Sequence, residues 1–158
     1  MTACPFLIKD MSKIYDYLVN NILNTLERDA KRIIQECVDE RTYKHQTYNL
    51  YDSYGYGIYL KGKLVRRGYL NSVPRAEEGN KWYSKILYGR DEINKYLQSG
   101  YSPSGAIDLT IVAAMPYAKV LEEGRGGIHH AYKVISMSFK KLDQIKAKYQ
   151  GFVKTIKQ

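Results

Sequence analysis

Apolar residues recur at steps of three and four along the first forty positions of the chain. The recurring positions are Leu18, Ile22, Leu26, Ala30, Ile33 or Ile34, and Cys37. This spacing predicts a helix that starts at Ser12, a residue type suited to an N-cap, and runs to about Val38. Such a helix is roughly 40 Å long at about 1.5 Å per residue, which is more than a small sheet needs for cover. We therefore expect its overhang to pack on something else.

The period changes to two in the middle of the chain. Tyr56, Ile58 and Leu60 alternate with other residues up to the turn-like run 61–63, and Leu64 resumes the alternation. Residues 47–70 are therefore predicted to form a β-hairpin or a long bent strand pair. Strict alternation also opens residues 106–124, where Ile107, Leu109, Ile111 and Ala113 share one face. We interpret this segment as a strand that bends or breaks at Pro116.

Two further segments carry helical patterns. Residues 71–105 are polar and irregular, and within them 81–87 and 91–98 are predicted as short helices in an excursion from the sheet. Apolar positions return at helical spacing from Ile135 through Leu142 and Ile145 to Ile156. The order of elements favours one α+β domain over residues 1–158. Its small antiparallel β-sheet is expected to pack against a long N-terminal helix and a C-terminal helix.

Net charge and tyrosine content both suit a protein that binds partners through its surface. The net charge is +9, and tyrosine is unusually frequent, with 16 residues against three Phe and one Trp. Residues 1–40 hold five Lys/Arg against seven Asp/Glu, whereas the remainder is strongly basic. A basic excess of this kind suits an acidic protein partner or a nucleic acid, and tyrosine suits half-buried interfaces.

The cysteines and the hydropathy pattern bear on location. Cys4 and Cys37 have neither zinc-ligand spacing nor a redox pair, and Cys37 is expected to be a buried thiol. No run of about 18 apolar residues predicts a membrane span, and the start "MTACPFLIKDM" lacks the pattern of a signal peptide. These features predict a protein of the reducing cytoplasm, without a membrane partner.

Candidate chemistry gathers in "PYAKVLEEGRGGIHH", residues 116–130. Side chains of the neighbours Glu122 and Glu123 diverge in an extended segment, so the pair does not suit acid–base catalysis. The adjacent His129 and His130 diverge in the same way and have no third ligand at metal spacing. The three glycines lack the Lys-Ser/Thr of a phosphate-binding loop and are interpreted as a turn. No catalytic residue, metal site or cofactor is predicted.

The predicted hairpin carries the best nucleic-acid candidate in the chain. Its cations Lys61, Lys63, Arg66 and Arg67 are interleaved with tyrosines such as Tyr69. Aromatic rings beside cations stack bases and hold phosphates. The same alternation is also that of an ordinary solvent-facing strand, and both interpretations stay open.

Two short motifs carry a family resemblance. "TYNLYDS" supplies Thr47, Asn49, Leu50 and Ser53 after the long helix, and "PYAKVLEEG" supplies Tyr117, Ala118, Glu122 or Glu123, and Gly124 at the end of the late strand. In this order and spacing the chain resembles the tail-completion or neck proteins of tailed bacteriophages, which are related to tail-terminator proteins. Arg125 stands where the family pattern has Thr.

The resemblance implies a non-enzymatic structural protein of the virion that forms a homomeric ring at the head–tail junction. Its partners would be further copies of itself in six- or twelve-fold rings, the phage portal or connector, and tail proteins. DNA passing through the ring would contact the basic residues 61, 63, 66 and 67 without sequence specificity. The protein would occupy the virion neck or tail, and the host cytoplasm during assembly. The expected subunit or partner contacts are Asn49, Leu50, Ser53, Tyr117, Glu122, Glu123, Gly124 and Arg125.

Two other classes remain open on the sequence. One is a small basic nuclease or RNA-cleaving toxin of α+β fold, and the other is a non-catalytic nucleic-acid-binding module. Candidate residues for a nuclease are Arg66, Arg67, Tyr69, Glu122 or Glu123, and His129.

Overall fold

The computed structural model describes residues 5–43, 49–70, 80–82, 85–125, 130–149 and 153–157. A four-stranded sheet forms its centre, in the order β2-β1-β5-β6. The strands are β1 (Tyr54–Leu60), β2 (Lys63–Tyr69), β5 (Ile107–Ala113) and β6 (Val153–Lys157). Strands β2, β1 and β5 pair antiparallel, whereas β6 pairs parallel to β5. The predicted α+β class and the antiparallel sheet are confirmed, with β6 as an unforeseen parallel edge.

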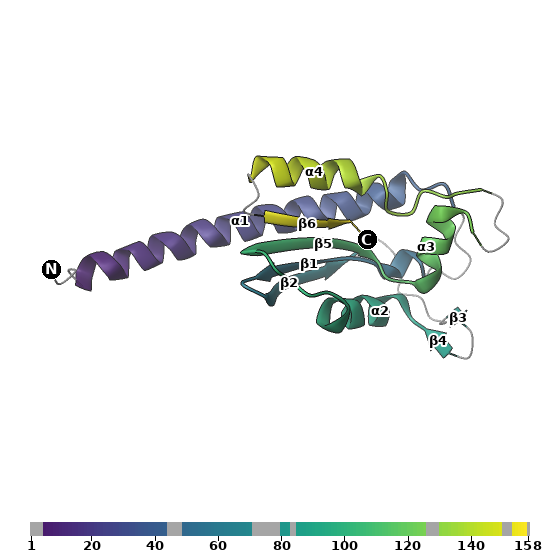
Figure 1. Ribbon diagram of the computed structural model, residues 1–158, viewed down its shortest axis with the longest axis horizontal. Helices are drawn as coiled ribbons and strands as arrows, with labels where there is room; N and C mark the ends of the chain where they lie inside the picture. Colours follow the sequence, from purple (N-terminus) through teal and green to yellow (C-terminus); the bar gives the residue numbers. More distant parts are fainter. Residues whose placement is uncertain are drawn as a thin grey trace.

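Helices cover both faces of this sheet (Figure 1). The long helix α1 (Pro5–Asp39) crosses one face and has α4 (Ser138–Lys148) beside it. The shorter α2 (Gly89–Lys95) covers the opposite face and continues as one π-helical turn through residues 96–100. Helix α3 (Pro116–Glu123) follows β5, and the small hairpin β3 (Asn80–Trp82) and β4 (Lys85–Leu87) lies at the end of the molecule near α3.

The main core lies between α1 and the sheet. Leu26, Ile33 and Cys37 from α1 meet Tyr54 and Ile58 from β1, and all five are nearly or fully buried. The side chains of β1 alternate between two layers, because the neighbouring Tyr59 joins a smaller core with Ile93 and Leu97 beneath α2. Strand β5 is also buried on both faces, because helices cover both sides of the sheet. Its alternating sequence suggested one buried face, whereas it is a central strand with two.

The predicted hairpin is confirmed. Leu60 pairs with Lys63 across a two-residue turn in which Lys61 and Gly62 have φ angles of 47° and 83°. Two positive φ values define the type I′ turn, whose twist matches that of the strands it joins. The register shifts by one residue between Ile58 and Tyr59, which marks a β-bulge.

Several predicted boundaries are wrong. Helix α1 begins at Pro5, so Ser12 lies inside the helix and does not cap it. Residues 81–82 and 85–87 lie in the paired strands β3 and β4, where a helix was predicted. The last helix ends at Lys148, and Ile156 belongs to β6. Strand β5 ends at Ala113, close to the predicted break at Pro116, but residues 116–123 then form the helix α3, which was not predicted.

Candidate functional site

The two adjacent glutamates have separate roles in α3. The carboxylate of Glu122 accepts backbone N–H groups from Val134, Ile135 and Ser136 at 2.7, 2.8 and 3.3 Å. Glu123 points elsewhere, and its carboxylate lies 3.0 Å from Arg125 Nε. The inference that the pair does not converge on one substrate atom is sound, although the two residues are helical and not extended. Glu122 joins the end of α3 to the segment that leads into α4.

The segment around these glutamates is a capped helix. Pro116 occupies its first turn, where a missing N–H leaves no hydrogen bond unmade. Gly124 ends it in the left-handed conformation at φ 65°, and the N–H groups of Gly124 and Arg125 donate to Leu121 O and Val120 O. These two bonds form a Schellman motif. Tyr117 and Ala118 therefore belong to the first turns of α3 and do not end a strand, which corrects the sequence interpretation.

The "TYNLYDS" motif forms an internal corner as far as it is described. Asn49, Leu50 and Ser53 are all buried, and Asn49 Oδ1 accepts the N–H of Gly89 at 3.3 Å. Ser53 Oγ donates to Leu50 O at 2.7 Å, which fixes the tight turn before β1. The corner anchors the start of α2 against the start of β1. Its three residues therefore stabilise the subunit from inside, which corrects their assignment to a subunit interface; Thr47 lies outside the described residues.

A partly buried ion pair completes this corner. Asp52 is 4% exposed, and its Oδ1 lies 2.7 Å from Nε of Arg90 on α2. The Arg90 guanidinium also stacks over the ring of Tyr69, 5.3 Å from its centroid. Neither Asp52 nor Arg90 was singled out from the sequence, because the pair spans 38 positions.

The basic residues of the hairpin do not form one patch. Arg66 and Arg67 are neighbours on β2 and so point to opposite faces of the sheet. Arg66 Nε lies 3.5 Å from Glu27 Oε2 on α1, whereas Arg67 donates to Asn94 Oδ1 on α2 at 3.1 Å. Lys61 lies with its Nζ 5.5 Å from the centroid of the Tyr15 ring. The fold therefore does not bring residues 61, 63, 66 and 67 together on a single DNA-facing surface.

The residues considered for a nuclease are also dispersed. Tyr69 shares the Asn94 acceptor with Arg67 on the α2 side, while Arg66 faces α1 and Glu122 is occupied by three backbone N–H groups. His129 lies outside the described residues. Within the described ranges, no three His, Cys, Asp or Glu side chains gather closely enough to hold a metal ion.

The most distinctive surface is the N-terminal end of α1. Residues 5–18, hereafter the arm, project beyond the sheet (Figure 1), and every residue from Asp10 to Leu18 is exposed. Five of the seven large apolar side chains exposed in the described part of the chain lie on the arm. They are Met11, Ile14, Tyr15, Tyr17 and Leu18. Exposed apolar residues gathered in this way mark an interaction surface.

The apolar side of the arm lies on a different face of α1 from the one that packs on the subunit's own core. Met11, Ile14 and Leu18 follow one another at steps of three and four and form a stripe. Counted at about 100° per residue, this stripe is rotated by roughly a third of a turn from the face that buries Leu26 and Ala30. The stripe is therefore a separate face, suited to a second molecule.

Among the described residues, no helix combines the length and the hydropathy needed to cross a membrane. Searches against protein-family models, curated proteins and solved structures find no match for this chain.

Two features escaped the sequence interpretation. The arm was foreseen only as an overhang beginning at Ser12, and its apolar stripe was not recognised. The signal for it was present in Met11 and Ile14, which extend the apolar period toward the N-terminus. The second feature is a groove between α1 and α4 lined by cations. Its residues lie more than a hundred positions apart, so no local pattern indicates it.

Proposed function

We propose that the protein is a structural subunit of a homomeric ring at the head–tail junction of a tailed bacteriophage. In the ring, the arm of each subunit packs on the next subunit, and the assembly occupies the virion between the portal or connector and the tail. The two family-like motifs support the phage assignment, and the arm supports the assembly. A ring requires one patch to meet a different patch on its neighbour, and a projecting arm is well suited to such a contact.

The arm is the observation that carries this proposal. Met11 is 68% exposed, Tyr17 67%, Ile14 59% and Leu18 55%, so each exposes more than half of its surface. Full burial of a large apolar side chain contributes about 1.5–3 kcal/mol, so burying the exposed parts of five such residues contributes about 5 kcal/mol. Association costs at least about 4 kcal/mol in lost freedom of motion, so the arm supplies much of what a ring contact needs and leaves room for further contacts.

Charge contributes less to this assembly than the sequence suggested. In a ring, the first forty residues, with five Lys/Arg against seven Asp/Glu, would be a natural partner for the basic remainder of a neighbouring subunit. Several of these acidic residues are engaged within the subunit: Glu27 pairs with Lys31 and Arg66, and Asp29 with Arg32. The apolar arm therefore replaces the acidic helix as the proposed ring contact.

Mass photometry of matched variants tests the role of the arm. Ile14→Glu with Leu18→Glu places two charges on the apolar stripe, whereas Ser12→Glu with Asn20→Glu places the same two charges on exposed polar positions. We expect the first pair to dissociate the ring and the second pair to leave it intact, for the protein alone or mixed with its portal and tail partners. Equal behaviour of the two variants would contradict the proposal.

A nuclease assay separates the proposed role from the alternative. We expect no cleavage of single- or double-stranded DNA or RNA by the purified protein. Cleavage that is lost in a His129→Ala variant would favour the nuclease instead.

A further inference from the structure

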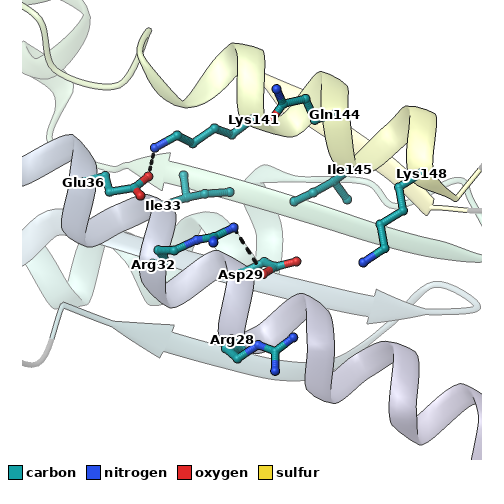
Figure 2. Close-up of a pocket in the computed structure, with 9 residues that line it drawn as sticks. All are labelled: Arg28, Asp29, Arg32, Ile33, Glu36, Lys141, Gln144, Ile145 and Lys148. Carbon is teal, nitrogen blue, oxygen red and sulfur yellow. Dashed lines mark hydrogen bonds and ion pairs between the residues drawn. The ribbon is translucent and has the colours of Figure 1, made fainter.

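A cationic groove runs between α1 and α4 on the outer side of the sheet (Figure 2). Its volume is about 440 Å³. Arg28 and Arg32 line it from α1, and Lys141 and Lys148 line it from α4; the carboxylates among its lining residues are Asp29 and Glu36. Four cations against two carboxylates leave an excess of two positive charges in the groove.

The positive excess concentrates at one end of the groove. Arg32 is paired with Asp29 at 3.5 Å, and Lys141 is paired with Glu36. Within the described part of the chain, Arg28 and Lys148 have no carboxylate partner, and Figure 2 shows both at the end of the groove away from Glu36. Arg28 and Lys148 are exposed, so their charges are available to a ligand from solvent.

The positive charge of the groove also affects the pKa of a lysine that lines it. Lys141 is half-buried, and burial together with the neighbouring Arg32 charge holds the pKa of Lys141 below its ordinary value. A bound anion would offset the repulsion between the Arg32 and Lys141 charges, since it adds a negative charge beside both. The groove is thus arranged to gain from an anionic ligand.

We propose that this groove binds the phosphodiester backbone of double-stranded DNA. Lys141 and Lys148 are seven residues apart, which corresponds to about 10 Å along the axis of α4. Lys141 is held by its ion pair with Glu36, and Figure 2 shows its ammonium and that of Lys148 toward opposite ends of the groove. Successive phosphates of a nucleic-acid strand suit such separated cations better than one small anion does. Contacts of this type are electrostatic and independent of base sequence.

This inference deepens the proposed function and rests on it for the source of the DNA. It moves the DNA-contacting surface from the hairpin to the α1–α4 groove. In the hairpin, Arg66 is engaged with Glu27 and Arg67 with Asn94 on the opposite face. In the groove, cations from two helices face a common space.

Fluorescence anisotropy with a short labelled DNA duplex tests the groove. The test variant is Arg28→Gln with Lys148→Gln, and the matched control is Lys61→Gln with Lys63→Gln; all four residues are exposed. We expect the groove variant to bind roughly tenfold or more weakly near 0.1 M salt, and its log–log salt slope to fall by about 2. The control is expected to retain the affinity and slope of the wild type within about threefold, because its two charges lie outside the groove.

Three results would overturn the inference. The first is the absence of salt-sensitive DNA binding by the wild type, or displacement of the bound duplex by a low concentration of inorganic phosphate at constant ionic strength, which would show that the groove takes a small anion. The second is an equal loss of affinity in the groove and hairpin variants, which indicates diffuse charge. The third is a loss of affinity in Arg28→Lys with Lys148→Arg, which keeps both charges, as large as that of the glutamine variant. Circular dichroism establishes that each variant is folded.

Oligomeric state is measured on the same samples so that the two proposals can fail separately. The groove variant is expected to assemble like the wild type, since its changes lie outside the arm. If the protein forms rings that do not bind DNA, the proposal of DNA binding in the groove is wrong and the ring proposal stands. If the protein binds DNA but never assembles, alone or with partners, the ring proposal is wrong and DNA binding by the groove stands.

Discussion

Replacing Glu122 by alanine is expected to lower the stability of the subunit substantially. The substitution removes a carboxylate that accepts three backbone N–H groups within a span of three residues. Hydrogen bonds to a charged group contribute about 1.5–3 kcal/mol each when they are formed singly. Because water reaches part of this half-buried site and replaces some of the lost bonds, we expect a total loss of about 3 kcal/mol.

The neighbouring Glu123 provides a matched control. It lies in the same helix turn, so alanine changes helix propensity equally at both positions. Its contacts are exposed ion pairs with Arg125 and Lys119, and such pairs contribute at most about 1 kcal/mol.

Urea unfolding and thermal melting followed by circular dichroism distinguish the two variants. For a chain of this length about 3 kcal/mol corresponds to a fall in Tm of roughly 6–12 °C, whereas Glu123→Ala is expected to shift Tm by less than about 4 °C. Equal shifts for the two variants would refute the assignment of Glu122 as the link between α3 and α4.

Further predictions concern backbone packing and buried ionisable groups. Gly89→Ala is expected to lower the free energy of unfolding in urea by about 2–3 kcal/mol, because the added Cβ would lie 2.4 Å from a backbone oxygen of the internal corner. Gly62→Ala should lower it by about 1 kcal/mol, because φ is 83° there but no atom lies within 4 Å of the added Cβ. Burial raises the pKa of the Cys37 thiol to about 12, so a thiol reagent at pH 8 should modify Cys37 only after denaturation, and rapid modification of Cys37 in the native protein would contradict this. Burial also raises the pKa values of Tyr43 and Tyr59 to about 12 from an ordinary value of 10, so their stabilising contribution is complete below about pH 10 and lost as pH rises toward 12. Part of the tyrosinate absorbance should therefore appear together with loss of the circular dichroism signal, and full ionisation with an intact signal would contradict the burial of these rings.

The sequence predicts elements whose signal is local. The long helix follows from the repeat through Leu26 and Ala30, because a helix that buries one face must place an apolar residue there every three or four positions. The β1–β2 hairpin follows from alternation around Lys61 and Gly62, and its turn geometry lies within the turn itself. In both cases the determining residues are neighbours in the sequence.

Elements that depend on distant partners were predicted wrongly. Residues 153–157 continue the helical spacing of the last apolar positions, yet they form a strand because β5 offers a free edge, where Ile107 pairs with Val153. Short apolar runs of this length fit either period, and the available partner decides between them. The β3–β4 hairpin is a further case of a short segment whose pattern does not determine its structure.

The candidate sites follow the same division. The sequence predicts that the side chains of Glu122 and Glu123 point apart, since adjacent side chains diverge in either a strand or a helix. It does not indicate that Glu122 accepts bonds from residues 134–136, because that contact depends on where the chain returns. The groove combines Arg28 with Lys148, and only the packing of α1 against α4 brings them together.

An electron-microscopy reconstruction of the assembled protein, alone or bound to the portal and tail proteins, tests the central proposal most directly. We predict a closed ring in which the stripe of Met11, Ile14 and Leu18 from each subunit lies buried against the next subunit. A ring whose arms project freely into solvent, or the absence of any ring in every mixture, would contradict the account.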